Sequence, residues 1–294
     1  SEPVATLRAS EAVIYGRFGY GVASRGRTVE VDTKRAAIRP GTPGGGTVRV
    51  MPMADAATLL PPLYDDVSER RPGWSARPTT WWDAVRMWSA EGKSHTLAAV
   101  HTGPEGDDGF AIYEVERKDD KRFLNVHDLW GDSQAAALAL WRFLFRIDLV
   151  SHVKAQYRPL DEAMEHIFVD RRALAVTEIE DETWLRLADV PAALAARTFG
   201  ELAAGAGSVV IEVRDPFLPA NSGCYLLGDG PARPVTEPAE LTMDVDVLAE
   251  LYLGDVAPSL LASVGRIDVA KAEALRVADR LFAVAGAPWC GTFF

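Results

Sequence analysis

The sequence of 294 residues is poor in the residue types that form disulfides and metal sites. It contains 2 cysteines, Cys224 and Cys290, and 5 histidines. The cysteines lie far apart and form no CxxC pattern, and the histidines show neither HxxxH nor HExxH spacing. We therefore expect two reduced thiols and no metal site.

Long apolar runs and several nucleotide-binding and hydrolase motifs are also absent. No stretch approaches the about 18–20 apolar residues that cross a bilayer, and residues 1–30 carry charges where a signal peptide would be apolar. There is no GxSxG elbow, no GxGxxG pattern after a strand and no P-loop, because the glycine-rich residues 41–46 lack the Lys-Ser/Thr pair. We expect a soluble, cytoplasmic protein with no membrane span.

Negative charge predominates. The chain has 42 Asp and Glu against 31 Lys and Arg, a formal net charge of −11. Such a surface repels nucleic-acid phosphates and anionic lipid, whereas it attracts cationic amines. With 48% hydrophobic and 25% charged residues, the composition is that of a globular protein that can bury full cores. Nucleic acid is therefore not an expected partner.

The first part of the chain predicts a strand, a short helix and a second strand. The helix is expected over 12–18, capped by Ser10 or Glu11 and ended by Gly19, and the second strand over 20–31. Three such elements cannot enclose a core by themselves. The Pro- and Gly-rich residues 32–47 then predict a linker.

Residues 47–187 predict a mixed α/β unit, in which helices cover one sheet. Strands are expected over 47–51, 95–101, 109–117, 122–130, 150–156 and 183–187. Helices are expected over 55–69 after Asp55, over 80–89, after a cap at Asp132 or Ser133, and over 160–167. The acidic run 180–182 predicts a solvated face. For the tryptophans, packing in a core or an interface is favoured over a ligand cage; the residues are Trp74, Trp81, Trp82 and Trp88.

After the small-residue run 203–207, the last part has an α+β pattern. Short strands are expected over 208–214, 221–227, 231–236 and 239–243. Helices are expected over 245–253 and, after an Asp268 cap, over 270–284.

Two segments could carry chemistry. Residues 10–21, SEAVIYGRFGYG, place the phenol of Tyr15 on the short helix, where packing is the simplest role. Residues 288–294, PWCGTFF, form an aromatic C-terminus, where most termini are polar. This tail either only docks on the core, or the burial of its phenylalanines carries the Phe294 carboxylate, of intrinsic pKa about 3.5, into a cleft where it accepts a proton.

These two ends, the glycine-rich linker, the Trp81-Trp82-Asp83 segment and the late α+β module resemble the Eis (enhanced intracellular survival) family of acetyltransferases of actinobacteria. The resemblance covers essentially the whole sequence. It implies three parts: residues 1–31 as the C-terminal remnant of a first GNAT domain, residues 32–199 as the linker and a second, degenerate GNAT-like domain, and residues 200–294 as a sterol-carrier-like domain.

The resemblance also implies an activity and roles for particular residues. The expected reaction is acetyl transfer from acetyl-CoA to amines, including aminoglycosides and lysine side chains, by a protein that forms hexamers. Tyr15 matches the general acid, the Phe294 carboxylate matches the general base, and Ser10 matches a residue on the acetyl-CoA side of the site.

The sequence departs from this family pattern at the cofactor loop. The strand–helix junction of the second unit, residues 131–135 (GDSQA), has one glycine, an acidic residue and no arginine. Since the chain starts at Ser1 without a methionine, we expect a fragment that lacks most of the first GNAT domain and does not turn over alone. Two alternatives stay open, a sterol-carrier-like module that binds a lipid or another small molecule without catalysis, and a structural assembly piece.

Overall fold

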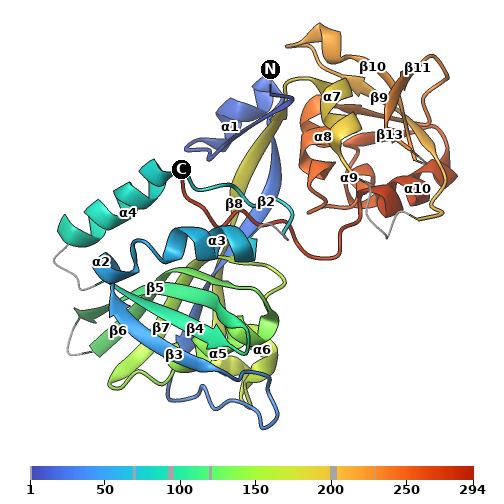
Figure 1. Ribbon diagram of the computed structural model, residues 1–294. Helices are drawn as coiled ribbons and strands as arrows, with labels where there is room; N and C mark the ends of the chain where they lie inside the picture. Colours follow the sequence, from blue (N-terminus) through green and yellow to red (C-terminus); the bar gives the residue numbers. More distant parts are fainter. Residues whose placement is uncertain (1, 69–70, 92–95, 119–120, 199–203, 229) are drawn as a thin grey trace. The chain divides into compact units, whose positions relative to one another are not determined.

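The computed structural model describes residues 2–68, 71–91, 96–118, 121–198, 204–228 and 230–294 (Figure 1). It divides into two compact units. The first unit comprises Ser1–Arg25 and Asp181–Phe294, and the second comprises Gly26–Glu180. The division falls within strands β2 (Gly21–Asp32) and β8 (Leu174–Leu187), so each of these strands contributes to both units.

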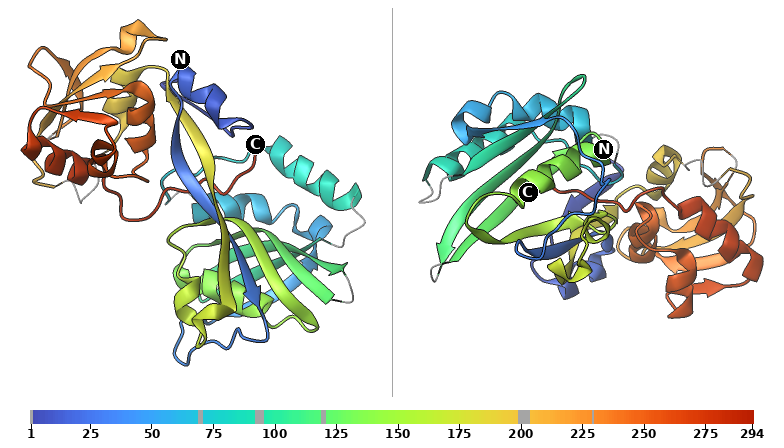
Figure 2. Two further views of the ribbon diagram at one scale, coloured as in Figure 1. Left: turned by 180° about the vertical axis from the view of Figure 1, so that it is seen from behind. Right: turned by 90° about the horizontal axis from the view of Figure 1, so that it is seen from below.

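The second unit is built on a mixed sheet with strand order β8-β2-β7-β6-β5-β4-β3. The β6–β7 pair is parallel, while β2–β7, β3–β4, β4–β5 and β5–β6 are antiparallel. The strands β2 and β8 lie side by side in both views of Figure 2. The remaining strands are β3 (Thr47–Pro52), β4 (Leu97–Gly103), β5 (Gly106–Lys118), β6 (Lys121–Gly131) and β7 (Val150–Pro159).

Helices cover both faces of this sheet. Helix α5 (Gln134–Leu144) begins where Ser133 Oγ accepts a hydrogen bond from Ala136 N at 3.2 Å, so Ser133 is the cap. Its Trp141 packs in one core with Ala111 of β5. The adjacent Phe110 points to the other face. There Trp82 of α4 (Thr79–Glu91) lies 6.4 Å from the Phe110 ring.

The helix expected over 55–69 is interrupted in the described part of that range. Helix α2 (Met53–Ala56) is separated by a turn from α3 (Leu60–Ser68), and Asp55 lies within the first turn of α2, not before it. The physical reason is the Pro61-Pro62 pair. Proline lacks an N–H and is accepted only in the first turn of a helix, so α3 starts afresh at Leu60.

Trp81 and Trp82 of α4 pack around an internal cation, while the side chain of Trp88 lies outside the described residues. The buried Arg77 guanidinium lies 3.9 Å from the centre of the Tyr64 ring and 4.1 Å from that of Trp81. It also pairs with the Asp128 carboxylate. These aromatic rings therefore surround a side chain of the chain itself, which confirms the packing role expected of Trp81 and Trp82.

The first unit combines the ends of the chain. Strand β1 (Val4–Leu7) pairs with the end of β8, from Val4↔Leu187 to Leu7↔Trp184. Helix α1 (Ala12–Tyr15) continues as a 3₁₀ turn over Gly16–Phe18 and ends at Gly19, as predicted. Glu11, one of the two predicted caps, precedes α1, but its side chain makes no capping hydrogen bond.

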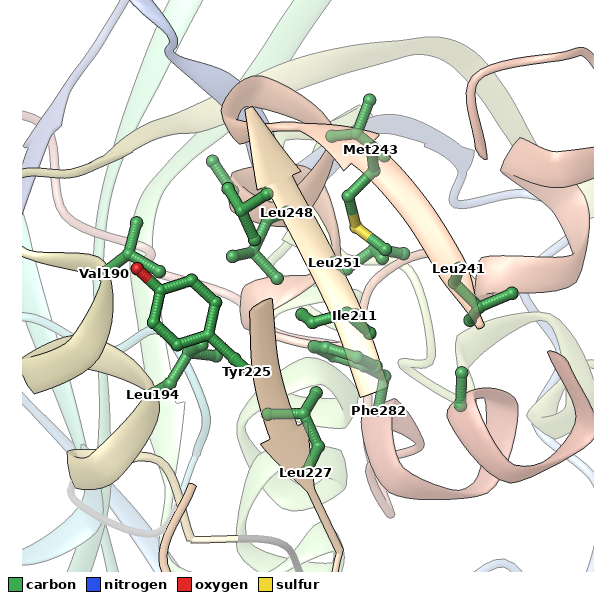
Figure 3. Close-up of a cluster of buried hydrophobic side chains, with 14 of the residues drawn as sticks. Val190, Leu194, Ile211, Tyr225, Leu227, Leu241, Met243, Leu248, Leu251 and Phe282 are labelled. Carbon is green, nitrogen blue, oxygen red and sulfur yellow. The ribbon is translucent and has the colours of Figure 1, made fainter. Parts of the chain in front are cut away.

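The rest of the first unit is a sheet of order β11-β10-β9-β12-β13 covered by helices. Its core consists of side chains that point toward one another from sheet and helices (Figure 3). Phe282, Leu248 and Ile211 are each 0–1% exposed, so these side chains fill the space between helices α8 and α10 and strand β9. The Asp268 cap is wrong, because Asp268 lies in a strand, β13, and Lys271 precedes α10.

The predicted strands of this module are present, and the structure adds α7, α9 and β13, which were not among the predicted elements. The elements are α7 (Val190–Ala196), β9 (Val209–Arg214), β10 (Gly223–Leu227), β11 (Arg233–Val235), β12 (Leu241–Asp244), α8 (Val245–Tyr252), α9 (Pro258–Ser263), β13 (Ile267–Val269) and α10 (Ala272–Phe282). None of the helices in the described ranges is both long enough and apolar enough to cross a membrane.

Candidate functional site

The turn that ends α1 places Tyr15. Gly19 has φ +80°, and a Cβ at this position would lie 2.7 Å from Val245 Cγ1 and 2.9 Å from Arg186 Cζ. Only glycine combines that backbone conformation with so close an approach. The backbone N–H of Tyr20 then donates to the carbonyl oxygen of Tyr15 at 3.3 Å, which closes the turn.

The Tyr15 ring is half-buried among aromatic side chains of the same unit. Its centre lies 6.1 Å from that of Tyr20 and 6.4 Å from that of Trp184 on β8. The Trp184 indole donates in turn to the Asp181 carboxylate. Ser10 lies in the loop between β1 and α1 and is exposed. The phenol is thus fixed against β8, while the hydroxyl of Ser10 faces solvent.

The C-terminal tail is anchored through its first half. Trp289, Cys290 and Thr292 are 4%, 1% and 2% exposed, whereas Phe293 and Phe294 are 68% and 51% exposed. The expected burial of both phenylalanines is therefore wrong for this chain. The anchored residues precede them, so the tail is held while its last two side chains reach outward.

The anchor is the carboxylate of Glu182, which is 1% exposed. It accepts hydrogen bonds from the backbone N–H groups of Cys290 at 3.0 Å and Gly291 at 2.8 Å. Ser24 Oγ donates to it at 3.0 Å and the Arg8 guanidinium at 3.3 Å. The prediction of a solvated face is wrong for Glu182: burial of this charge is offset by four donors.

A second group holds the end of the tail. Arg8 Nη2 and Nε donate to the carbonyl oxygen of Thr292 at 2.8 and 3.2 Å, and the Arg8 guanidinium lies 5.2 Å from the centre of the Phe293 ring.

The thiol of Cys290 in this tail is buried. Burial, and after it the nearby Glu182 carboxylate, raises the pKa of this thiol, so it stays neutral at pH 7.

Strand geometry relates the tail to Tyr15. Glu182 and Trp184 are two residues apart on β8, about 6.6 Å along the strand. Glu182 holds the tail, and Trp184 packs against Tyr15. Tyr15 and the residues just before Phe294 are therefore held at nearby positions of one strand, β8.

In the second unit, an internal ion pair lies where the parallel pairing of two strands ends. Strands β6 and β7 pair in parallel as far as Val126↔Ala155. Beyond this point Arg158 Nη1 donates to the carbonyl oxygen of Leu129 on β6 at 2.9 Å, and the same guanidinium binds Glu162 at 2.8 Å. Beyond the last parallel residue pair, the Arg158 side chain therefore links β7 to β6.

The loop before α5 lies beside a hollow of about 440 Å³ with an acidic lining. Five carboxylates line it, those of Asp66, Glu105, Asp107, Asp108 and Asp132. A phosphate at this helix N-terminus would meet like charge, which opposes the attraction of the helix dipole. Among the residues that the structure describes, no three His, Cys, Asp or Glu side chains are placed to hold a metal ion.

Two family models match consecutive parts of the chain. Residues 73–187 match the acetyltransferase (GNAT) domain, and residues 190–291 match the sterol carrier protein domain. The N-acetyltransferase Eis of Mycobacterium tuberculosis is 35% identical over 296 residues, which cover 96% of this chain and 69% of that protein. The chain belongs to the Eis family of N-acetyltransferases.

Other Eis-family and GNAT proteins agree with this assignment. An N-acetyltransferase of Streptomyces griseus is 36% identical over 312 residues, covering 100% of this chain and 74% of that protein. The crystal structure of Eis1 from Mycobacterium abscessus matches 100% of this chain and 73% of its own, with a TM-score of 0.90 and 34% identity. A GCN5-related N-acetyltransferase from Anabaena variabilis, at 20% identity and a TM-score of 0.83, shares the fold.

The function follows from these relatives. The protein is a GNAT-type N-acetyltransferase that uses acetyl-CoA as co-substrate and acts on amines. The expected architecture, a GNAT-like domain followed by a sterol-carrier-like domain, is confirmed. The comparisons support neither the expected inactivity of the chain alone nor the non-catalytic alternative.

Proposed function

We propose that this Eis-family chain serves the acetylation of polycationic amines, with aminoglycosides and lysine side chains as substrates. The net charge of −11 supports this substrate class, because an acidic surface concentrates cations around the protein. The observation that carries the catalytic proposal is the attachment of Tyr15 and the C-terminal tail to nearby positions of β8, Trp184 and Glu182.

In the proposed reaction the Phe294 carboxylate, through a water molecule, takes a proton from the substrate ammonium. The neutral amine attacks the thioester carbonyl of acetyl-CoA, the C–N bond forms and the C–S bond breaks. Tyr15 donates its phenolic proton to the departing thiolate, and the second proton that the acylated nitrogen loses restores the phenol. The products are the acetamide, coenzyme A and the one proton that the carboxylate has taken up. Each proton transfer of this kind contributes typically ~10²–10⁴-fold to a rate.

Ser10, exposed five residues before Tyr15, would lie on the acetyl-CoA side of this site. The loop before α5 does not fit the cofactor, because its carboxylate lining repels a pyrophosphate and the Arg158 side chain links β7 to β6 beyond their last parallel residue pair. This supports the proposal that residues 32–199 contain a degenerate GNAT-like domain, next to the remnant at 1–31 and the sterol-carrier-like residues 200–294. We propose a homo-oligomeric, hexameric protein in the cytoplasm, where acetyl-CoA is supplied.

The test uses the full-length protein, acetyl-CoA and either kanamycin or a lysine-containing peptide, with release of coenzyme A followed by a thiol-reactive dye. We expect release to depend on the amine and the amine to gain an acetyl group by mass spectrometry. The KM for kanamycin should rise with ionic strength more than the KM for a singly charged amine. Absence of amine-dependent release with both substrates would contradict the proposed substrate class.

A further inference from the structure

The strand β8 carries several acidic residues, and one of them differs from its neighbours. Glu178 is exposed, as an acidic residue on a surface strand normally is, whereas Glu182 is 1% exposed. A carboxylate is buried at high cost unless donors surround it. The donors that surround Glu182 come from the residue after β1, from β2 and from the C-terminal tail: they are Arg8, Ser24, Cys290 and Gly291.

The two oxygens of Glu182 are used in a defined way. Oε2 accepts from Cys290 N and Ser24 Oγ, and Oε1 accepts from Gly291 N and the Arg8 guanidinium. Two consecutive backbone N–H groups on one carboxylate fix both the position and the direction of the chain at that point. Phe294 follows Gly291 by only three residues.

We infer that Glu182 is a positioning residue for acetyl transfer: it holds Cys290 and Gly291 and thereby sets where the Phe294 carboxylate reaches. The inference rests on the proposed role of Phe294. Arg8 supports the same arrangement, because its guanidinium joins Glu182 to the carbonyl oxygen of Thr292. Glu182 itself touches no reacting atom in this account. Its effect is transmitted through the tail.

The central variant is Glu182→Gln in the full-length protein. A glutamine keeps the size of the side chain but replaces one acceptor oxygen by an NH₂ group, which cannot accept from the tail. We expect faster hydrogen exchange at the Cys290 and Gly291 amides. Since a misplacement of about 1 Å can cost about 10²-fold in rate, kcat with kanamycin should fall by about that factor while the KM for acetyl-CoA is retained. Glu182→Asp, which keeps both acceptors, should lie between glutamine and wild type.

The matched control is Glu178→Gln, the same change at an exposed site of the same strand, which should leave exchange and kcat unchanged. If Glu182→Gln does not fold, Arg8→Lys keeps the charge but loses the forked contact with Thr292, and it should give the same pattern more weakly. Exchange in α8 reports whether each variant is folded.

Two results would overturn the inference: unchanged exchange at residues 290 and 291, or unchanged kcat despite faster exchange. Failure of the proposed function has a different signature. If a residue added after Phe294 leaves kcat unchanged while Glu182→Gln still loosens the tail, the anchor exists but the terminal carboxylate is not the base, and the inferred catalytic consequence falls with it.

Discussion

Each of the two units contains a buried arginine–glutamate pair, and the two pairs hold different kinds of segment in place. Arg158 and Glu162 in the second unit have side chains 5% and 6% exposed, and they bind each other, the Leu129 carbonyl oxygen and the Trp141 indole. Arg8 and Glu182 in the first unit have side chains 11% and 0% exposed. Both also bind the C-terminal tail, and Glu182 accepts a further hydrogen bond from Ser24 on β2.

The difference lies in what the surplus hydrogen-bonding capacity holds. In the second unit, the further hydrogen bonds of the pair join adjacent strands and a helix, so the pair links elements of the sheet and its cover. In the first unit it reaches a segment with no regular secondary structure that ends on the proposed base. Whether a buried ion pair only stabilises the fold or also positions a functional segment thus depends on which other groups it binds. Mutations should separate the two cases.

The largest expected effect is on the first unit. Tyr15→Phe in the full-length protein removes only the proposed acid, so kcat should fall ~10²–10⁴-fold with little change in the KM for acetyl-CoA. Tyr252→Phe is the control, since it also removes one phenol, which here donates to the Ala193 carbonyl oxygen. Steady-state kinetics check both variants. Equal kcat values for Tyr15→Phe and wild type would remove Tyr15 from the mechanism.

The matching change in the second unit should affect stability, not chemistry. Arg158→Met leaves Glu162 buried without its cation, which should lower the free energy of unfolding by about 3–5 kcal/mol. Urea unfolding measures this loss. Arg86→Met breaks the exposed pair with Asp83, whose side chains are 55% and 46% exposed, and should cost ~0–1 kcal/mol. A loss of kcat in folded Arg158→Met would show that this pair also affects catalysis, and the two pairs would then not differ in function.

The end of the tail gives the third test. One alanine added after Phe294 moves the carboxylate by about 3.5 Å, and kcat should fall by about 10²-fold. Replacing Phe294 by leucine keeps the carboxylate in place and serves as the control for the side chain, which is 51% exposed. Acetyl transfer to kanamycin is again the measurement, and full activity in the extended protein would rule out the terminal base.

The smallest effect concerns a third buried pair, Arg186 and Asp215 in the first unit, 2.6 Å apart. Burial acts to raise the pKa of Asp215, but hydrogen bonds from Asn221 and Arg186 outweigh it and hold this pKa below its usual value. A carboxyl whose pKa is lower in the folded state stabilises the fold above the unfolded-state pKa of about 3.9 and loses this contribution as pH falls.

We therefore expect Asp215→Asn to lower Tm at pH 7 and the difference from wild type to shrink as pH falls below about 4. Thermal unfolding over a pH series measures it. Asp268→Asn, at a side chain 75% exposed, should follow the wild-type curve. A Tm difference for Asp215→Asn that does not depend on pH would show that the ion pair contributes nothing through its charge.

Local signals predicted many of the elements. The helix that carries Tyr15 ends at Gly19, and α5 begins after Ser133, because a positive φ and a capping hydroxyl are properties of a few neighbouring residues. Strand β8 is the opposite case. The sequence predicts only 183–187, yet the strand starts at Leu174, because residues 175–179 are exposed and their extended conformation depends on pairing with neighbouring strands.

The sequence by itself determined the family, the succession of a GNAT-like and a sterol-carrier-like domain, and the candidates Tyr15 and Phe294, because motifs and periodic patterns are read over short spans. Only the tertiary structure decided that Glu182 is an anchor. Its partners Cys290 and Gly291 lie 108 and 109 residues away. A carboxylate on a strand looks alike in sequence whether water or backbone N–H groups solvate it, and the fold alone brings those donors to it.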